Sequence, residues 1–305
     1  MSPAQPGGKV HPPGLRRAQP AGSGGLRSNG SPGQQARLKA ARRLTKRAFR
    51  DRERAFLAEG PQAVAEAHAY HATITDLFVT AAARSRHGDL VDAIAADAIP
   101  VHLVNDAVMA ELAQTVTPQG LLAVCRFIDV PLTEAITART KLVAILANVR
   151  DPGNAGTVLR VADAAGADAV IFADASVDPY NGKCVRASAG SLFHLPVVTG
   201  ARLNDVVQAA RDNGITVLAA DGRTGESLDD NTNLTKPTAW MFGNEAWGLP
   251  DELLREADEA VAVPIYGKAE SLNLATAAAV CLYASARVHA AQRLPPVAME
   301  RNGTR

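Results

Sequence analysis

Short apolar runs alternate with helix-period segments through the second half of the chain. Runs rich in β-branched or aromatic residues occupy 142–146, 169–172, 215–220, 240–242 and 260–263, and helical spacing occupies 157–165, 203–213 and 274–291. Gly166 and Gly214 follow two of these helical segments, where a left-handed C-cap favours glycine. Alternating strands and helices predict a parallel sheet with helices on both faces. We therefore expect an α/β fold that binds ligands at the carboxyl ends of its strands.

The first half of the chain shows a weaker α/β pattern. Helical spacing at 61–70, 90–98 and 106–114 alternates with strand-like runs at 73–80, 101–104 and 121–128. This pattern predicts a small α/β unit at 36–130, a linker at 131–140 and the larger unit at 141–292. Residues 1–35 contain eight Gly and six Pro, so we expect a disordered basic tail there. Residues 293–305 are expected to form a flexible C-terminal tail.

Charge is distributed unevenly, although the formal net charge is only +1. Residues 1–60 contain 13 Lys or Arg and three Asp or Glu, a difference of +10; the remaining residues carry 19 against 28, a difference of −9. Within 36–60, apolar residues at helical spacing predict a helix with one packed side and one basic side. The basic side is either a solvated surface or a contact for RNA phosphates, and the excess of cations favours RNA. The predicted RNA-facing residues are Arg42, Arg43, Lys46, Arg47 and Arg50.

Composition and spacing exclude several classes of protein. No apolar run reaches the roughly 18 residues that span a bilayer, so we expect a cytoplasmic protein with no membrane partner. Cys125, Cys184 and Cys281 lie far apart, which predicts buried reduced thiols and no metal site. The glycine motifs of dinucleotide-binding and P-loop proteins are absent, which disfavours a nicotinamide-dependent enzyme or a nucleotidase.

Polar residues follow two of the predicted strands. Asn154 lies in a tight turn after the run at 142–146, and Arg160 lies in the helix that follows. Arg160 is either a member of a buried ion pair or a group directed at a phosphate. After the run at 240–242, Gly243 permits close approach of the backbone to a ligand. Glu245 either holds a ligand or caps the next helix.

A third polar segment follows the run at 260–263. Ser271, Leu272 and Asn273 open the long helical segment, and Ser271 is a favourable N-cap residue. Each of the three segments alone is as typical of a turn or a helix cap as of a catalytic element. Their occurrence together, each after a strand, favours one shared site.

The three segments resemble the motifs of the SpoU (TrmH) family of RNA 2′-O-ribose methyltransferases, in the SPOUT superfamily. The resemblance rests on N-x-x-x-x-x-R at 154–160, G-N-E at 243–245 and P-x-x-x-x-x-x-S-L-N at 264–273. The Lys/Arg-rich start, FLAEG at 56–60 and TPQGLLAV at 117–124 resemble the family's ribosomal-protein-like substrate-binding domain. The arrangement is similar to the rRNA-directed branch, which includes thiostrepton-resistance methyltransferases of 23S rRNA.

The resemblance implies a fold, a cofactor and a set of site residues. The fold is an α/β structure with a SPOUT-type parallel sheet and a C-terminal trefoil knot, and the protein acts as a homodimer. S-adenosyl-L-methionine is the implied methyl donor and 23S rRNA the implied substrate. The implied cofactor-binding residues are Gly243, Val263, Ile265 and Leu272. The implied catalytic residues are Asn154, Arg160, Glu245, Ser271 and Asn273.

Two alternatives within this family remain open from the sequence. One is a methyltransferase that acts on tRNA, and the other is a catalytically inactive RNA-binding or ribosome-assembly protein. The role of Arg160 also needs a physical argument, because a guanidinium loses its proton only above about pH 12 and makes a poor general base. We expect Arg160 to position a substrate phosphate and to favour ionisation of the ribose hydroxyl.

Overall fold

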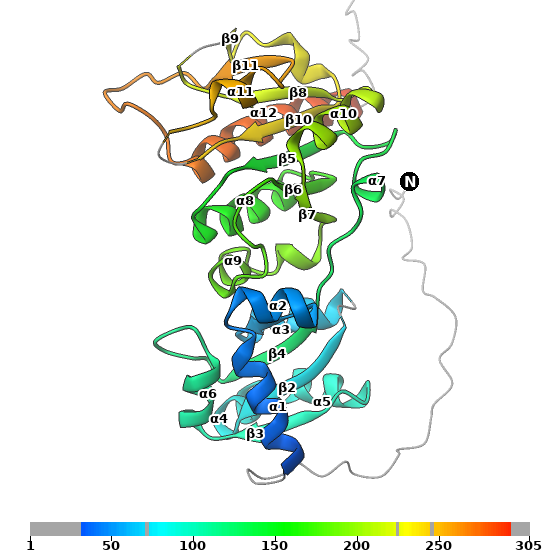
Figure 1. The fold of residues 1–305 in the computed structure, drawn as a ribbon, viewed down its shortest axis with the longest axis vertical. Helices are drawn as coiled ribbons and strands as arrows, with labels where there is room; N and C mark the ends of the chain where they lie inside the picture. Colours follow the sequence, from blue (N-terminus) through cyan, green and yellow to red (C-terminus); the bar gives the residue numbers. More distant parts are fainter. Residues whose placement is uncertain (1–31, 71–72, 224–225, 245–246, 294–305) are drawn as a thin grey trace, which may run out of the picture.

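The structure, a computed structural model, describes residues 32–70, 73–223, 226–244 and 247–293. These residues form two sheets with their helices, stacked along the long axis of the molecule (Figure 1). The four-stranded sheet has the order β1-β4-β2-β3 and the seven-stranded sheet the order β7-β6-β5-β10-β8-β11-β9. Every pairing in the larger sheet is parallel, as the alternating pattern of the second half predicts.

The four-stranded sheet is mixed and is covered on both faces. Its strands are β1 (Ala55–Glu59), β2 (Ile74–Thr80), β3 (Val101–Val104) and β4 (Leu121–Arg126). Its helices are α1 (Pro32–Arg43), α2 (Arg47–Glu53), α3 (Pro61–Ala69), α4 (Ala81–Arg86), α5 (Gly88–Ala96) and α6 (Asp106–Leu112). Strand β4 pairs antiparallel with β1 and β2, and β2 pairs parallel with β3.

The basic segment 36–60 differs from the single helix that its spacing predicts. The segment contains α1, α2 and then strand β1, and the chain reverses at Arg54, which has a φ of 49°. Helix α1 begins at Pro32, inside the expected tail, and buries Gln34, whose Nε2 donates to the Leu103 carbonyl at 3.1 Å. Residues 1–31 of that tail and 294–305 of the other lie outside the described residues.

The strands of the seven-stranded sheet follow the predicted apolar runs closely. They are β5 (Leu142–Ala147), β6 (Ala169–Ala173), β7 (Val197–Ala201), β8 (Thr216–Ala220), β9 (Glu226–Ser227), β10 (Thr238–Phe242) and β11 (Glu259–Ala262). Its helices are α7 (Leu132–Ala135), α8 (Pro152–Ala164), α9 (Gly182–Ala187), α10 (Leu203–Asp212), α11 (Asp251–Leu254) and α12 (Leu274–Arg293). Strands β7 and β9 and helices α9 and α11 have no counterpart among the predicted elements, because their apolar runs are short.

Alternate residues of each central strand enter opposite cores. On β5, Leu142, Ala144 and Leu146 pack with α8 and α12, whereas Val143 and Ile145 pack with α10. This division follows from the two-residue period of a strand. The expected linker contains α7 and packs on the α10 side through buried residues.

Helix α12 has the length and composition of a membrane span. Among the described residues it is the one helix that passes this test, and core helices of soluble proteins pass it too. Its residues Ala278, Cys281 and Leu282 are buried against the sheet and α8, as predicted for a packed helix. All three cysteines are free and buried, as predicted. Burial raises the pKa of Cys125 and of Cys281 to about 12, so these thiols stay protonated at neutral pH.

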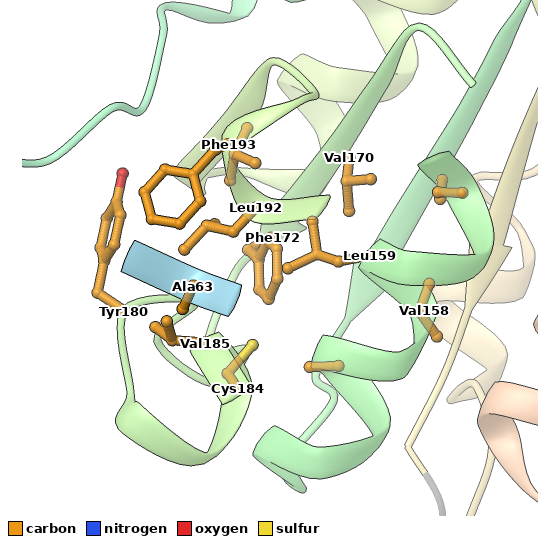
Figure 2. Packing of buried hydrophobic residues seen from close by; sticks show 14 of the residues in the cluster. Ala63, Val158, Leu159, Val170, Phe172, Tyr180, Cys184, Val185, Leu192 and Phe193 are labelled. Atoms are coloured by element: carbon orange, nitrogen blue, oxygen red, sulfur yellow. The ribbon is translucent and has the colours of Figure 1, made fainter. Parts of the chain in front are cut away.

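The two sheets share one hydrophobic core. The Tyr180 ring stacks on Phe127 with ring centres 3.8 Å apart, and it also contacts Phe56, at 4.7 Å. Figure 2 shows Ala63 of α3 among Tyr180 and Leu192 of the larger unit. Shared burial of aromatic rings stabilises the contact and holds the two units in one arrangement.

Candidate functional site: a cavity at the carboxyl ends of β8, β10 and β11

A cavity of about 720 Å³ opens at the carboxyl edge of the larger sheet. It is lined by residues 220–223 at the end of β8, 242–244 and 247–248 at the end of β10, 261–265 and 269–272 at the end of β11 and in the loop that follows, and 274 and 277 on α12. These segments meet because β8 pairs with both β10 and β11 in parallel, which places all three carboxyl ends at one edge. The four predicted cofactor-binding residues line this cavity: Gly243, Val263, Ile265 and Leu272.

Gly243 allows the loop after β10 to fold tightly beside the cavity. Asn244 and Gly248 exchange two backbone hydrogen bonds of 2.9 Å, which returns the chain over Gly243. A Cβ atom on Gly243 would lie 2.5 Å from the Gly248 carbonyl carbon, closer than real Cβ contacts. The side chain of Asn244 donates to the Asn148 carbonyl at 3.1 Å and so joins this loop to the loop after β5.

The predicted catalytic residues divide into two groups. Ser271 lines the cavity. Asn154 and Asn273 lie together instead, because Asn273 Nδ2 donates to Asn154 Oδ1 at 3.2 Å. Asn273 Oδ1 also accepts from the Ala275 N–H at 2.9 Å, so Asn273 caps α12 and the prediction that Ser271 does so is wrong. Glu245 lies outside the described residues.

The first turn of α8 holds Asn154 in place. Asp151 caps the helix, since its Oδ1 accepts from the Asn154 N–H at 2.8 Å. A hydrogen bond from Lys183 Nζ, 2.7 Å from Asp151 Oδ2, is the main cause that lowers the pKa of Asp151. The capping carboxylate is therefore ionised at neutral pH, and its negative charge stabilises the helix N-terminus.

Arg160 has an exposed side chain on α8. Within the described part of the chain it makes no ion pair. Of the two interpretations of Arg160, a buried ion pair is therefore excluded, and a group directed at a phosphate remains. Arg160, Asn154 and Asn273 are also absent from the lining of the cavity as described. One copy of the chain thus leaves Arg160 available to a ligand from outside.

The predicted RNA-facing residues also divide. Arg42, Arg43, Lys46 and Arg47 are exposed around α1 and α2. Arg42 forms an ion pair with Glu111, and Arg47 lies 3.7 Å from Asp51. Arg50 differs, because it is 3% exposed and its Nη2 lies 2.6 Å from Asp178 Oδ2 in the larger unit. The prediction that Arg50 contacts RNA is therefore wrong, because its guanidinium is buried and paired with Asp178.

Asp221 and Arg223 also belong to the cavity, and the sequence motifs did not single them out. The Asp221 carboxylate is buried and accepts from Arg223 Nη2 at 2.7 Å, and the same Nη2 donates to the Leu249 carbonyl at 2.7 Å. Burial acts to raise the pKa of Asp221, but the hydrogen bonds from Arg223 outweigh it and the pKa is lowered. The available signal was a polar pair directly after a predicted strand.

Fold and cavity together define an α/β protein with a cavity at the carboxyl edge of a parallel sheet, where proteins of this architecture bind their ligands. The sequence model of the SpoU rRNA Methylase family matches residues 141–283, and that of the MRM3-like substrate binding domain matches residues 35–123. The chain is 33% identical over 247 residues to the Bacillus subtilis 23S rRNA (guanosine(2553)-2′-O)-methyltransferase RlmP, covering 81% of this chain and 94% of the relative. The chain therefore belongs to the SpoU methylase family, as its three motifs predict.

Solved structures agree with this assignment. The AdoMet-bound rRNA methyltransferase from Sinorhizobium meliloti has a TM-score of 0.74 and 32% identity, over 83% of this chain and 95% of that one. The SpoU methyltransferase AviRb from Streptomyces viridochromogenes, in complex with the cofactor AdoMet, has a TM-score of 0.74 and 28% identity, over 84% and 99% of the two chains. The similarity thus extends over both sheets.

Proposed function

We propose that this protein is an S-adenosylmethionine-dependent RNA 2′-O-ribose methyltransferase that acts on 23S rRNA. The observation that carries the proposal is the cavity at the carboxyl ends of β8, β10 and β11, where all four predicted cofactor-binding residues meet. Relatives named as 23S rRNA 2′-O-methyltransferases, and similar structures with bound AdoMet, support the reaction and its donor.

The residues of the cavity fit S-adenosylmethionine. A volume of about 720 Å³ suits a ligand of this size, within the roughly 300–1,000 Å³ typical of small-molecule sites. Val263, Ile265 and Leu272 offer apolar contacts, whereas Gly243 leaves backbone groups accessible. The cofactor supplies an activated methyl group for transfer to a ribose hydroxyl.

Arg160 is the proposed catalytic residue of the chain. Its exposed guanidinium is a cation with five N–H donors, so it binds a phosphate of the target nucleotide and favours ionisation of the neighbouring 2′-hydroxyl. Asn154, next to the start of α12, is proposed to align the same nucleotide.

We propose that the active enzyme is a homodimer, in which Arg160 of one copy serves the cavity of the other. The position of Arg160 outside the cavity lining of its own chain supports this arrangement. Helix α12 offers an apolar surface beside α8, since Val280 and Tyr283 are exposed and Tyr283 Oη donates to the Ala164 carbonyl at 3.4 Å. Family membership further supports a trefoil knot in the larger unit and a ribosomal-protein-like smaller unit. Activity in the cytoplasm is proposed from the sequence alone.

The test is transfer of tritiated methyl groups from S-adenosylmethionine to unmodified 23S rRNA and to unmodified tRNA transcripts. Label in 23S rRNA, released as a 2′-O-methylated nucleoside after digestion, is the expected result. Label in tRNA alone would show that tRNA is the substrate, and the proposed reaction would stand. Absence of label from every RNA fraction, with S-adenosylhomocysteine still bound, would favour the inactive RNA-binding protein. Sedimentation velocity on the same samples measures the proposed dimer.

A further inference from the structure

A second cavity lies at the junction of the two units, apart from the cofactor cavity. Its volume is about 310 Å³. Glu59, Gly60 and Ala63 line it from the end of β1 and the start of α3, and Arg186 and Ala189 line it from α9 and the turn after it. The remaining lining comes from Gln62 and from the loop between α6 and β4: Thr115, Thr117 and Gln119. We call this cavity the junction cleft.

The charged residues of the junction cleft neutralise each other. Arg186 Nη1 lies 2.9 Å from Glu59 Oε2, and the Glu59 side chain is 6% exposed. Glu59 also accepts a hydrogen bond from Thr115 Oγ1 and one of 3.0 Å from the Gln114 N–H. A site for a phosphate needs an unpaired cation or a cluster of N–H donors. The described lining instead suits a neutral polar ligand.

Two polar side chains of the junction cleft are available to such a ligand. Thr117 and Gln119 are exposed, and within the described residues neither side chain makes a hydrogen bond. An amide and a hydroxyl each both donate and accept, as the edge of a nucleobase does. Gly60, with a φ of 96°, keeps the floor open, because a Cβ there would lie 2.9 Å from Gln119 Oε1.

The junction cleft adjoins the exposed basic residues of α1 and α2. Gln114, in the loop between α6 and β4, donates from Nε2 to the Thr45 carbonyl at 3.5 Å, and Lys46 and Arg47 follow Thr45 directly in the chain. Figure 1 shows α9, which supplies Arg186, next to α2 and α3. An RNA strand held by these cations would therefore pass the mouth of the cleft.

We propose that the junction cleft binds one unstacked nucleobase of the RNA substrate and reads its edge through Gln119 and Thr117. The inference rests on the proposed function, and it adds a site of sequence discrimination to it. Specific RNA recognition usually targets splayed bases in loops, read by hydrogen bonds to their edges. Because both units line the cleft, a base bound there also sets the position of the RNA relative to the catalytic unit.

The test compares three variants in binding to an unmodified 23S rRNA transcript. Gln119→Ala removes the amide, Thr117→Trp fills the cleft from an exposed position, and Val116→Trp is the matched control. Val116 is fully exposed in the same loop and does not line the cleft. We expect Gln119→Ala and Thr117→Trp each to weaken the affinity about tenfold, as the loss of a base contact does. The dependence on salt concentration stays unchanged, because no phosphate contact is lost.

The readouts separate failure of the inference from failure of the proposed function. Affinity for S-adenosylhomocysteine should equal that of the wild type in all three variants, and so should the thermal unfolding midpoint of Gln119→Ala. Wild-type affinity for the transcript in both cleft variants, or an equal loss in Val116→Trp, would overturn the inference while methyl transfer by the wild type stands. A wild type that neither binds the transcript nor methylates RNA would overturn both.

Discussion

Asn273 and Asn154 form a hydrogen bond of 3.2 Å although 119 positions separate them in the chain. Each belongs to a helix start that a carboxylate or amide caps, Asp151 for α8 and Asn273 for α12. Asn154 and Asn273 thus connect the starts of α8 and α12, although each is of a residue type that is common at helix starts. At this scale, single side chains decide whether the site keeps its shape.

Substitution of Arg160 separates positioning from structure. We expect Arg160→Ala to lower kcat about 10²- to 10³-fold, the loss typical for one electrostatic group that acts in the transition state. Arg160→Lys should recover a substantial part of the rate, because a positioning cation is sufficient. Stability should not change in either variant, since the side chain is exposed. Single-turnover methylation measures the effect, and a Lys variant as inactive as the Ala variant would contradict the positioning role.

Substitution of Gly243 tests the tight loop. Gly243→Ala forces the Gly248 backbone away, so we expect a loss of about 1–3 kcal/mol in unfolding free energy and at least a tenfold loss in S-adenosylhomocysteine affinity. Gly267→Ala is the control, because a Cβ there meets no atom within 4 Å. Calorimetric titration and urea unfolding measure both quantities. Equal behaviour of the two variants would show that the loop adapts.

Helix α2 shows how one short element serves two purposes. Arg47 on its outer side is exposed. Arg50 on its inner side donates hydrogen bonds to the Asp178 carboxylate and, at 2.9 Å, to the Leu44 carbonyl. The sequence places both cations in the same basic run. The helical repeat separates them, and packing against the larger unit decides which one is buried.

The ion pair of Arg50 and Asp178 gives a prediction on stability. Arg50→Met leaves the Asp178 carboxylate buried without its cation, so we expect a loss of about 3–5 kcal/mol in unfolding free energy. Arg47→Met removes an exposed pair and should cost under about 1 kcal/mol. Urea unfolding compares the two variants. A similar small loss of unfolding free energy in both variants would mean that Arg50 is solvated. A changed salt dependence of RNA binding in Arg50→Met would show that Arg50 contacts RNA after all.

The exposed cations of α1 and α2 give a prediction on RNA binding. Reversal of Arg42, Arg43, Lys46 and Arg47 to Glu should weaken binding to 23S rRNA strongly and flatten its salt dependence, because released counterions account for that dependence. The measurement is the dissociation constant at several salt concentrations. Affinity for S-adenosylhomocysteine is the control and should stay constant. An unchanged salt slope would place the RNA elsewhere on the molecule.

At the scale of the whole molecule, His194 joins the two units. Its Nδ1 lies 2.7 Å from Asp163 Oδ2 on α8, and its Nε2 lies 3.2 Å from Glu66 Oε2 on α3. The Tyr70 ring covers it with centres 4.2 Å apart. Because Asp163 is three positions after Arg160 on the same helix, this contact links the smaller unit to the helix that carries the proposed catalytic residue.

The His194 contact predicts a pH-dependent stability. Burial acts to lower the pKa of His194, but the hydrogen bonds with Asp163 and Glu66 outweigh it and the pKa is raised. Folding therefore favours the protonated ring. The resulting stability is fully present below the ordinary pKa of about 6.5 and is lost as the pH rises through the raised value. Urea unfolding of wild type and His194→Gln should differ more at about pH 6 than at about pH 9; a constant difference would contradict the prediction.

The sequence by itself determined the parts of this protein that depend on local patterns. Apolar runs and helical spacing predict most strands and helices of the larger unit, and parallel strands place their carboxyl ends at one edge. That rule grouped the segments after the strands at one edge, whereas the assignment of Gly243, Val263, Ile265 and Leu272 to a cofactor came from the resemblance to the SpoU motifs, and all four line one cavity. The rule concerns geometry between neighbouring strands and needs no knowledge of distant contacts.

The tertiary structure decided which of several equivalent residues is buried, paired or exposed. Arg50 and Arg160 both lie in helices with apolar neighbours, yet Arg50 is buried against Asp178 and Arg160 is exposed. Strand β1 became a strand because β4 supplies its hydrogen bonds, from a segment that follows it by more than sixty positions. The junction cleft likewise exists only where the two units meet. These outcomes depend on contacts between segments far apart in the chain, which local periodicity does not contain.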